Sequence, residues 1–199
     1  MLVCKKAPDF TAAAVLADGS IKKDYTLSEA LRGKYGLLFT YPLNFTFVCP
    51  TELIAFNKRI AEFKQRNVEV IGLSIDSEYS HLAWRNTPVE KGGIGPVQYT
   101  LVADVKHEIV KAYGVELPEA GIALRGTFLI DKQGIIRSIN INDAPLGRNV
   151  DEILRLVDAL QYHEAHGEVC PAGWVKGRAA LKASSEGVAS YLAANAEEL

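Results

Sequence analysis

The sequence lacks several features that define common protein classes. No apolar run approaches the roughly 20 residues that a membrane-spanning helix needs. There is no block of basic residues and the net charge is -2, so nothing favours binding to nucleic acid or to an acidic membrane surface. The charged N-terminus has no long apolar stretch behind it, unlike a signal peptide. We therefore expect a cytoplasmic protein with no nucleic-acid or membrane partner.

Cysteine is scarce, and the common nucleotide motifs are absent. Three cysteines, an odd number without framework spacing, argue against a secreted disulfide scaffold and favour reduced thiols. The glycine-rich stretch at 92–95 is not followed by a helical pattern, so it does not predict a phosphate loop or a dinucleotide site. With 199 residues, 48% of them hydrophobic, the chain has enough for one core and an extension.

The feature around which the chain is organised is Cys49, which is followed directly by Pro50. A buried strand at 37–41 precedes it, and apolar residues at helical spacing follow it. Proline suits the first turn of a helix, so Cys49 is predicted to lie at a helix N-terminus. Free N–H groups and the helix dipole favour a thiolate there. Taken alone, a structural buried cysteine is an equally good interpretation.

The order of the predicted elements indicates an α/β fold with a thioredoxin-like mixed sheet flanked by helices. A strand–helix–strand unit should be parallel, and a late hairpin adds antiparallel strands. We expect a domain at 1–167, which includes an N-terminal hairpin, and a C-terminal arm at 168–199. The predicted elements are a hairpin at 10–16 and 21–25, a helical turn at 28–31, strands at 37–41, 68–75 and 101–103, helices at 51–66, after Ser77 and at 105–113, a hairpin at 126–131 and 135–141, and a helix from Asn149 to Gly167.

A dithiol oxidoreductase is the first alternative that the fold suggests. That chemistry needs a second cysteine three residues after the first, but the position holds Glu52. A partner for Cys49 must then come from far along the chain, and only Cys170 and Cys4 remain. Cys170 lies in a Gly/Pro-rich segment that can rearrange. Cys4 lies among ordinary strand residues, and we expect it to be a buried spectator.

Several residues near Cys49 could support a reactive thiol. Thr46 supplies a hydroxyl one helical turn upstream, Pro42 an apolar wall, and Glu52 an acid that can orient an arginine. Arg125 opens an apolar strand and could stabilise negative charge on sulfur and on an attacked oxygen. Arg148, taken alone, is more typical of a surface loop.

A metal site is the second alternative. His163 and His166 lie three residues apart on a predicted helix, with Cys170 close behind. No fourth ligand has suitable spacing, and histidine near a helix C-terminus is favoured by the dipole. We therefore predict no metal site.

The chain resembles a typical two-cysteine peroxiredoxin of the alkyl hydroperoxide reductase C and thiol-specific antioxidant branch. The similarity covers nearly the whole chain, and Asn44 departs from it because close relatives usually carry Asp there. The stretches that carry the resemblance are Ala7–Phe10, Phe45–Glu52, Gly72–Ser77, His81–Trp84, Leu124–Asp131 and Glu168–Trp174.

The resemblance implies a thiol-dependent peroxidase that reduces hydrogen peroxide and organic hydroperoxides in antioxidant defence. Cys49 would be peroxidatic and Cys170 resolving, with an interchain disulfide between them. The supporting residues that it implies are Pro42, Thr46 and Arg125 in the pocket, with Glu52 and Arg148 behind Arg125. It implies no metal, haem, flavin or other cofactor in this chain.

The resemblance also implies partners. We expect a symmetric homodimer, assembled further into a ring of dimers such as a decamer. An external dithiol reductant would recycle the enzyme, either a thioredoxin-like protein or a flavoprotein disulfide reductase. A chaperone-like role of large assemblies remains an alternative.

Overall fold

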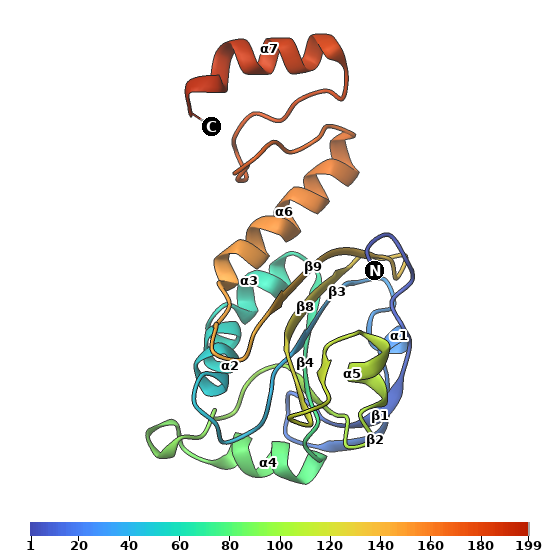
Figure 1. Ribbon diagram of the computed structural model, residues 1–199, viewed down its shortest axis with the longest axis vertical. Coiled ribbons are helices and arrows are strands. Elements are labelled where there is room, and N and C mark those ends of the chain that lie inside the picture. The colour runs from blue at the N-terminus through green and yellow to red at the C-terminus, as the bar shows by residue number, and fades with distance from the viewer. Residues whose placement is uncertain (199) are drawn as a thin grey trace. The chain divides into compact units, whose positions relative to one another are not determined.

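The computed structural model describes residues 1–198, and within them the chain forms a mixed sheet with helices on both faces (Figure 1). The strands are β1 Thr11–Val15, β2 Ile21–Thr26, β3 Tyr35–Thr40, β4 Val68–Ser74, β5 Thr100–Ala103, β6 Glu116–Leu117, β7 Ile122–Ala123, β8 Arg125–Ile130 and β9 Ile136–Asn142. The helices are α1 Leu27–Ala30, α2 Cys49–Lys58, α3 Ile60–Gln65, α4 Glu78–Asn86, α5 Glu108–Ala112, α6 Val150–His166 and α7 Ser185–Asn195, with 3₁₀ turns at Val89–Lys91 and Ala196–Glu198.

The main sheet has seven strands in the order β2-β1-β5-β4-β3-β8-β9. Strands β3, β4 and β5 run parallel, whereas the β1–β2, β1–β5, β3–β8 and β8–β9 pairs are antiparallel. This arrangement confirms the predicted thioredoxin-like mixed sheet and both predicted hairpins. It places the end of β3, and therefore the loop to α2, in the middle of the sheet rather than at an edge.

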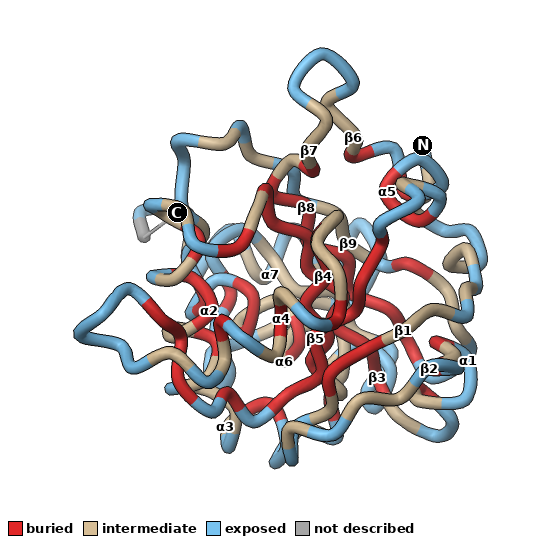
Figure 2. The backbone as a smooth tube through the Cα atoms, turned by 90° about the horizontal axis from the view of Figure 1, so that it is seen from below, coloured by how far each residue is buried: buried red, intermediate tan, exposed pale blue. Residues whose placement is uncertain are grey.

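Strand β3 is buried along its whole length, and Figure 2 colours the buried parts of the backbone red. Helices cover both faces of the sheet (Figure 1). Successive side chains point to opposite faces. Phe39 stacks on Phe56 of α2, with 4.2 Å between ring centroids, whereas Leu38 joins the core cluster that contains Leu27 and Ile109. Figure 1 accordingly shows α2 and α3 on one face and α1 and α5 on the other. The rigid central strand thus fixes the point from which the loop to Cys49 departs.

The structure corrects several predicted boundaries. The single helix expected at 51–66 is two helices, α2 and α3, separated at Arg59. The helix expected from Val105 begins only at Glu108, since residue 104 is followed by a turn in which His107 N donates to Asp104 O at 2.9 Å. The β6–β7 hairpin was not predicted, because two-residue strands are too short to show alternation.

Cys4 is neither buried nor in a strand, contrary to the prediction. It is exposed and lies in a turn with a φ of 65°. Its N–H donates to Ile136 O at 2.8 Å, which ties the turn to β9 without covering the side chain. The apolar neighbours that suggested burial belong to a segment that runs over the surface.

The chain folds into two compact units, Met1–Val150 and Asp151–Leu199. The second contains nearly all of α6, an antiparallel bridge between Val169 and Leu181, and α7. The functional division at residue 167 stays a prediction. Among the described residues, no helix is both long and apolar enough to cross a membrane.

Candidate active site

Cys49 is the first residue of α2, as the sequence predicted for a helix N-terminus, and it is 1% exposed. Pro50 therefore occupies the second helical position rather than the first. The N–H groups of Thr51 and Glu52 both point back to Val48 O, at 3.0 and 3.3 Å, so the first turn is closed around the thiol. The sulfur thus lies in a dry place where the positive end of the helix dipole is close.

Arg125 brings a positive charge to that sulfur from the start of β8. Its Nη1 lies 3.5 Å from the Cys49 Sγ and 2.6 Å from Glu52 Oε2. The Nε donates to Ala144 O at 2.7 Å, which fixes the plane of the guanidinium. Because Arg125 is only 2% exposed, water screens its charge little. The sequence-predicted pair of Cys49 and Arg125 is therefore brought together.

Glu52 holds two arginines in place, and its side chain is 2% exposed. Arg148 donates to it three times, from the backbone N to Oε1 at 2.9 Å, from Nε to Oε1 at 2.9 Å and from Nη2 to Oε2 at 2.8 Å. Burial raises the pKa of the Glu52 carboxyl, but the bonds and charges of Arg148 and Arg125 outweigh it and hold the pKa below its ordinary value. Glu52 is therefore ionised, and one carboxylate faces two guanidinium groups.

The side chain of Arg148 is buried, although its sequence context taken alone indicated a surface loop. Its side chain is 2% exposed and its guanidinium carbon lies 5.2 Å from the Phe39 ring centroid and 5.7 Å from that of Phe56. The Nη1 also donates to Gly126 O at 2.7 Å. The guanidinium of Arg148 thus makes cation–π contacts with aromatic rings of β3 and α2, whereas an arginine in a surface loop would be hydrated.

Pro42 and Thr46 lie in the loop that joins β3 to Cys49. Pro42 is buried, and Thr46 is partly buried. The Thr46 hydroxyl donates to Leu43 O at 2.8 Å, which orients the oxygen so that its lone pairs can accept a further hydrogen bond. The loop that leads to Cys49 therefore contains a buried proline and a hydroxyl of fixed orientation.

A buried polar network holds this loop, and sequence reasoning missed it. Asn44 accepts from the Tyr41 hydroxyl at 2.9 Å, and its amide nitrogen lies 3.0 Å from His81 Nδ1 and 2.9 Å from Ser80 Oγ. The backbone N of Asn44 donates to Asp76 Oδ2 at 2.9 Å. Burial lowers the pKa of His81, against the pull of Asp76 and Glu78. The sequence predicted the cap at Ser77, and with it the start of α4, but not the bonds between this helix and Asn44.

Cys170 lies in the second unit and is half-buried. Its thiol donates to Ala159 O of α6 at 3.5 Å, within the limit for sulfur. Burial raises the pKa of the Cys170 thiol, and the charge of Arg155 opposes that rise. This thiol therefore rests in its protonated form in a much more open place than Cys49.

The two histidines near Cys170 have other partners. His163 Nδ1 is bonded to Glu168 O at 2.7 Å, and His166 Nδ1 to Tyr162 O at 3.0 Å. In the part of the chain that the structure describes, no three His, Cys, Asp or Glu side chains gather as metal ligands.

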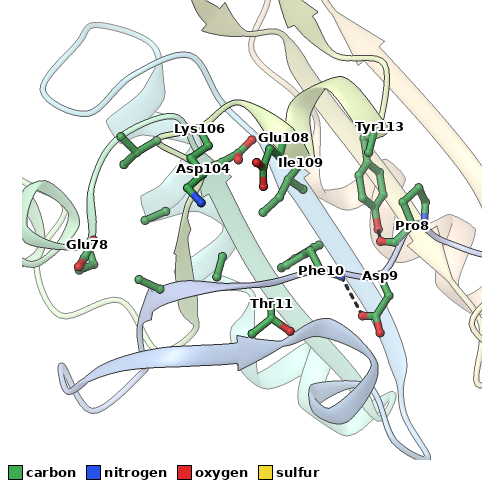
Figure 3. Close-up of a pocket in the computed structure, with 15 residues that line it drawn as sticks. Pro8, Asp9, Phe10, Thr11, Glu78, Asp104, Lys106, Glu108, Ile109 and Tyr113 are labelled. Carbon is green, nitrogen blue, oxygen red and sulfur yellow. Dashed lines mark hydrogen bonds between the residues drawn. The ribbon is translucent and has the colours of Figure 1, made fainter.

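A cavity of about 460 Å³ lies apart from Cys49, between the start of β1, β5 and α5 (Figure 3). Two of its polar groups hold the backbone nearby, since the Tyr113 hydroxyl donates to Pro8 O at 2.8 Å and Asp9 Oδ1 accepts from Phe10 N at 3.0 Å. No cysteine or histidine lines it. In this cavity, therefore, no thiol or imidazole is present that could act as a nucleophile or a base.

The chain is similar to known proteins over nearly its whole length. A model of the AhpC/TSA family matches residues 3–139, and a model of the C-terminal domain of 1-Cys peroxiredoxin matches residues 159–194. Alkyl hydroperoxide reductase C of Helicobacter pylori is 55% identical over 199 residues, 100% of both chains. Peroxiredoxin-1 of Gallus gallus is 57% identical over 178 residues, 89% of this chain and 88% of that protein. The structure of reduced 2-Cys peroxiredoxin from Plasmodium vivax matches with a TM-score of 0.94 at 48% identity, covering 97% of this chain and 99% of that one.

Proposed function

The chain belongs to the AhpC/TSA family and is a thiol-dependent peroxidase, and we propose that Cys49 is the thiol that attacks the peroxide. The observation that carries this assignment is the contact of 3.5 Å between the buried Cys49 sulfur and Arg125, which Glu52 holds in place. Neither Cys4 nor Cys170 has a comparable environment. The peroxidase is part of antioxidant defence.

The first half of the reaction uses the arginine to stabilise charge as the O–O bond breaks. The Cys49 thiolate attacks the terminal oxygen of a hydroperoxide, so an S–O bond forms and the O–O bond breaks. The leaving alkoxide or hydroxide takes up a proton and departs as alcohol or water. Arg125 donates to the oxygen that gains charge, and the Thr46 hydroxyl orients the peroxide, while Pro42 excludes water. Cys49 is left as a sulfenic acid.

The second half returns the enzyme to its starting state. The Cys170 thiolate of another chain attacks the Cys49 sulfenic sulfur, a disulfide forms and water leaves. An external dithiol reduces this disulfide by exchange, and both a thioredoxin-like protein and a flavoprotein disulfide reductase fit that chemistry. None of these steps calls for a metal, haem or flavin in this chain.

Assembly and location complete the proposal. An interchain disulfide between Cys49 and Cys170 requires two copies, and a symmetric homodimer forms two such disulfides. The proposal extends to a ring of dimers and to a cytoplasmic enzyme, as in the sequence-based expectation.

The test separates peroxidase chemistry from a passive binding role. Stopped-flow oxidation should be lost in Cys49→Ser and kept in the control Cys4→Ser. Cys170→Ser should still consume one equivalent of peroxide per chain but show no turnover. On a non-reducing gel, the oxidised Cys170→Ser variant should lack the covalent dimer that the oxidised unaltered protein forms. Equal oxidation rates in Cys49→Ser and the unaltered protein would refute the assignment. Suppression of client aggregation that survives in Cys49→Ser would favour an additional chaperone role.

A further inference from the structure

Arg155 of α6 holds the segment that begins with Cys170. Its Nη1 donates to Trp174 O at 2.9 Å. Trp174 itself is 2% exposed, and its Nε1 donates to Arg178 O at 3.0 Å. The arginine therefore fixes the far end of a five-residue segment, 170–174, whose near end carries the thiol.

The guanidinium of Arg155 is itself oriented by Glu152, one turn earlier on α6. Arg155 Nε donates to Glu152 Oε2 at 2.6 Å and Nη2 to Oε1 at 2.8 Å, a two-bond pair of fixed geometry. The side chain of Arg155 is 24% exposed and that of Glu152 is 49% exposed. The Nε and Nη2 groups of Arg155 are therefore bound to the more exposed carboxylate of Glu152. The Nη1 group is left to donate to Trp174 O in the segment that carries Cys170.

Cys170 needs help to become a nucleophile, because only a thiolate attacks sulfur. Its thiol proton is directed at Ala159 O, and burial raises its pKa. The titratable groups around it are few. Near it in the chain, the Tyr162 hydroxyl donates to Glu168 Oε2 at 2.8 Å, and His163 Nδ1 is bonded to the backbone O of Glu168 at 2.7 Å. Among these groups Arg155 is the permanent cation, and its field lowers the pKa of Cys170.

We propose that Arg155 is a positioning residue for the resolving step, holding the segment 170–174 on α6 and favouring negative charge on the Cys170 sulfur as it turns into the nucleophile. The proposal rests on the proposed function. Cys170 gives its proton to solvent, and its thiolate attacks the sulfenic sulfur of Cys49. The S–S bond forms, the S–O bond breaks, and hydroxide leaves and is protonated to water. The Cys170 sulfur is oxidised and the Cys49 sulfur is reduced.

The test uses the full chain carrying Cys4→Ser and Cys49→Ser, so that Cys170 is the remaining thiol. Its alkylation by iodoacetamide is followed as a function of pH. Arg155→Met should slow alkylation at pH 7 by roughly twofold to fivefold, the size that partly exposed charges produce, and should move the midpoint to higher pH. Arg155→Lys, which keeps the charge, should restore part of the rate.

Glu152→Gln distinguishes charge from mere packing. Both Arg155→Met and Glu152→Gln weaken the same pair, so a purely structural role moves the alkylation midpoint in one direction in both variants. Since Glu152 partly neutralises the guanidinium, the proposal requires Glu152→Gln to lower the midpoint and Arg155→Met to raise it. Thermal unfolding of each variant checks that the chain remains folded.

The outcomes are decisive and independent of the peroxidase assignment. Opposite midpoint shifts, with slower disulfide formation and unchanged sulfenic acid formation in Arg155→Met protein that retains its cysteines, support the role of Arg155. Unchanged midpoints, or shifts of the same sign in both variants, overturn it. A failure of Cys49 to react with peroxide would overturn the proposed function but would leave the alkylation result of Cys170 readable.

Discussion

The two proposed reaction partners, Cys49 and Cys170, lie in opposite kinds of environment. Cys49 is 1% exposed, begins a helix on a central strand and faces an arginine that is only 2% exposed. Cys170 is half-buried in a segment without regular structure and shares its surroundings with an arginine that water reaches. Both arginines are held by a glutamate, Arg125 by Glu52 and Arg155 by Glu152. The same pairing therefore occurs once in a dry place and once at the surface.

The proposed reaction gives a reason for this difference. The first step develops charge on oxygen, and fixed donors in a water-excluded site stabilise such charge most. The second step requires two sulfurs to approach to bonding distance, which a loosely packed segment allows more readily than a packed core. We expect changes around Cys49 to be costly and changes around Cys170 to be mild.

The largest difference should appear when the two glutamates are neutralised in turn. Glu52→Gln leaves two buried guanidinium groups without their carboxylate, and breaking a buried pair in this way typically costs about 3–5 kcal/mol of stability. Glu152→Gln breaks a pair at the surface, where such bridges contribute about 0–1 kcal/mol. Urea unfolding of both variants at pH 7 measures the contrast. Equal losses of stability would mean that burial does not distinguish the two pairs.

The next largest effect concerns the rate of oxidation. In the proposed mechanism Arg125→Met removes a donor from the oxygen that gains charge, and loss of one such donor costs about 2.7–4 kcal/mol of transition-state stabilisation in other enzymes. Oxidation of Cys49 should therefore slow by roughly 100- to 1,000-fold. Arg155→Met is the matched control and should leave this step unchanged. The oxidation rates of both variants and of the unaltered protein are measured by stopped flow at one peroxide concentration. A rate in Arg125→Met similar to that of the unaltered protein would contradict the proposed role of Arg125.

How far the sequence predicts this site depends on how local each feature is. Cys49 at a helix start was predictable, because Pro50 and the apolar spacing after it lie within a few residues. The burial of Arg148 was not, because its partner Glu52 is 96 positions away and only the folded sheet brings them together. The hydrogen bonds of Asn44 to Asp76, Ser80 and His81, which lie 32 to 37 positions away, were missed for the same reason. The exposure of Cys4 was not predicted, because a short apolar stretch in a turn has the same sequence pattern as one in a strand.

A smaller effect is expected in acid, with a definite sign. The pKa of Glu52 is lower in the folded chain than the ordinary value of about 4.3, so the unfolded chain binds more protons below that pH. The stabilisation by Glu52 is therefore complete above that value and is lost as the pH falls through the folded pKa. The difference in unfolding free energy between the unaltered protein and Glu52→Gln should shrink below about pH 4.3. A difference that stays constant down to pH 3 would contradict this linkage.

The smallest effect compares two serine caps, one in each compact unit. Ser77 accepts from Ser80 N at 3.2 Å at the start of α4, and Ser184 accepts from Gly187 N at 3.0 Å at the start of α7. Replacing either serine by alanine removes one bond of about 1 kcal/mol. Helix α4 buries Trp84 and His81, whereas no residue of α7 is buried.

The same lost bond should therefore appear in different observables. Ser77→Ala should lower the global free energy of unfolding by about 1 kcal/mol, since α4 unfolds with the core. Ser184→Ala should leave the global value nearly unchanged, because an 11-residue helix without buried residues is marginal and opens by itself. Amide hydrogen exchange in α7 should then accelerate about fivefold, the kinetic equivalent of that bond. A global loss of stability in Ser184→Ala as large as that in Ser77→Ala would show that the arm unfolds together with the core, and the contrast between the two cysteines would then need another cause.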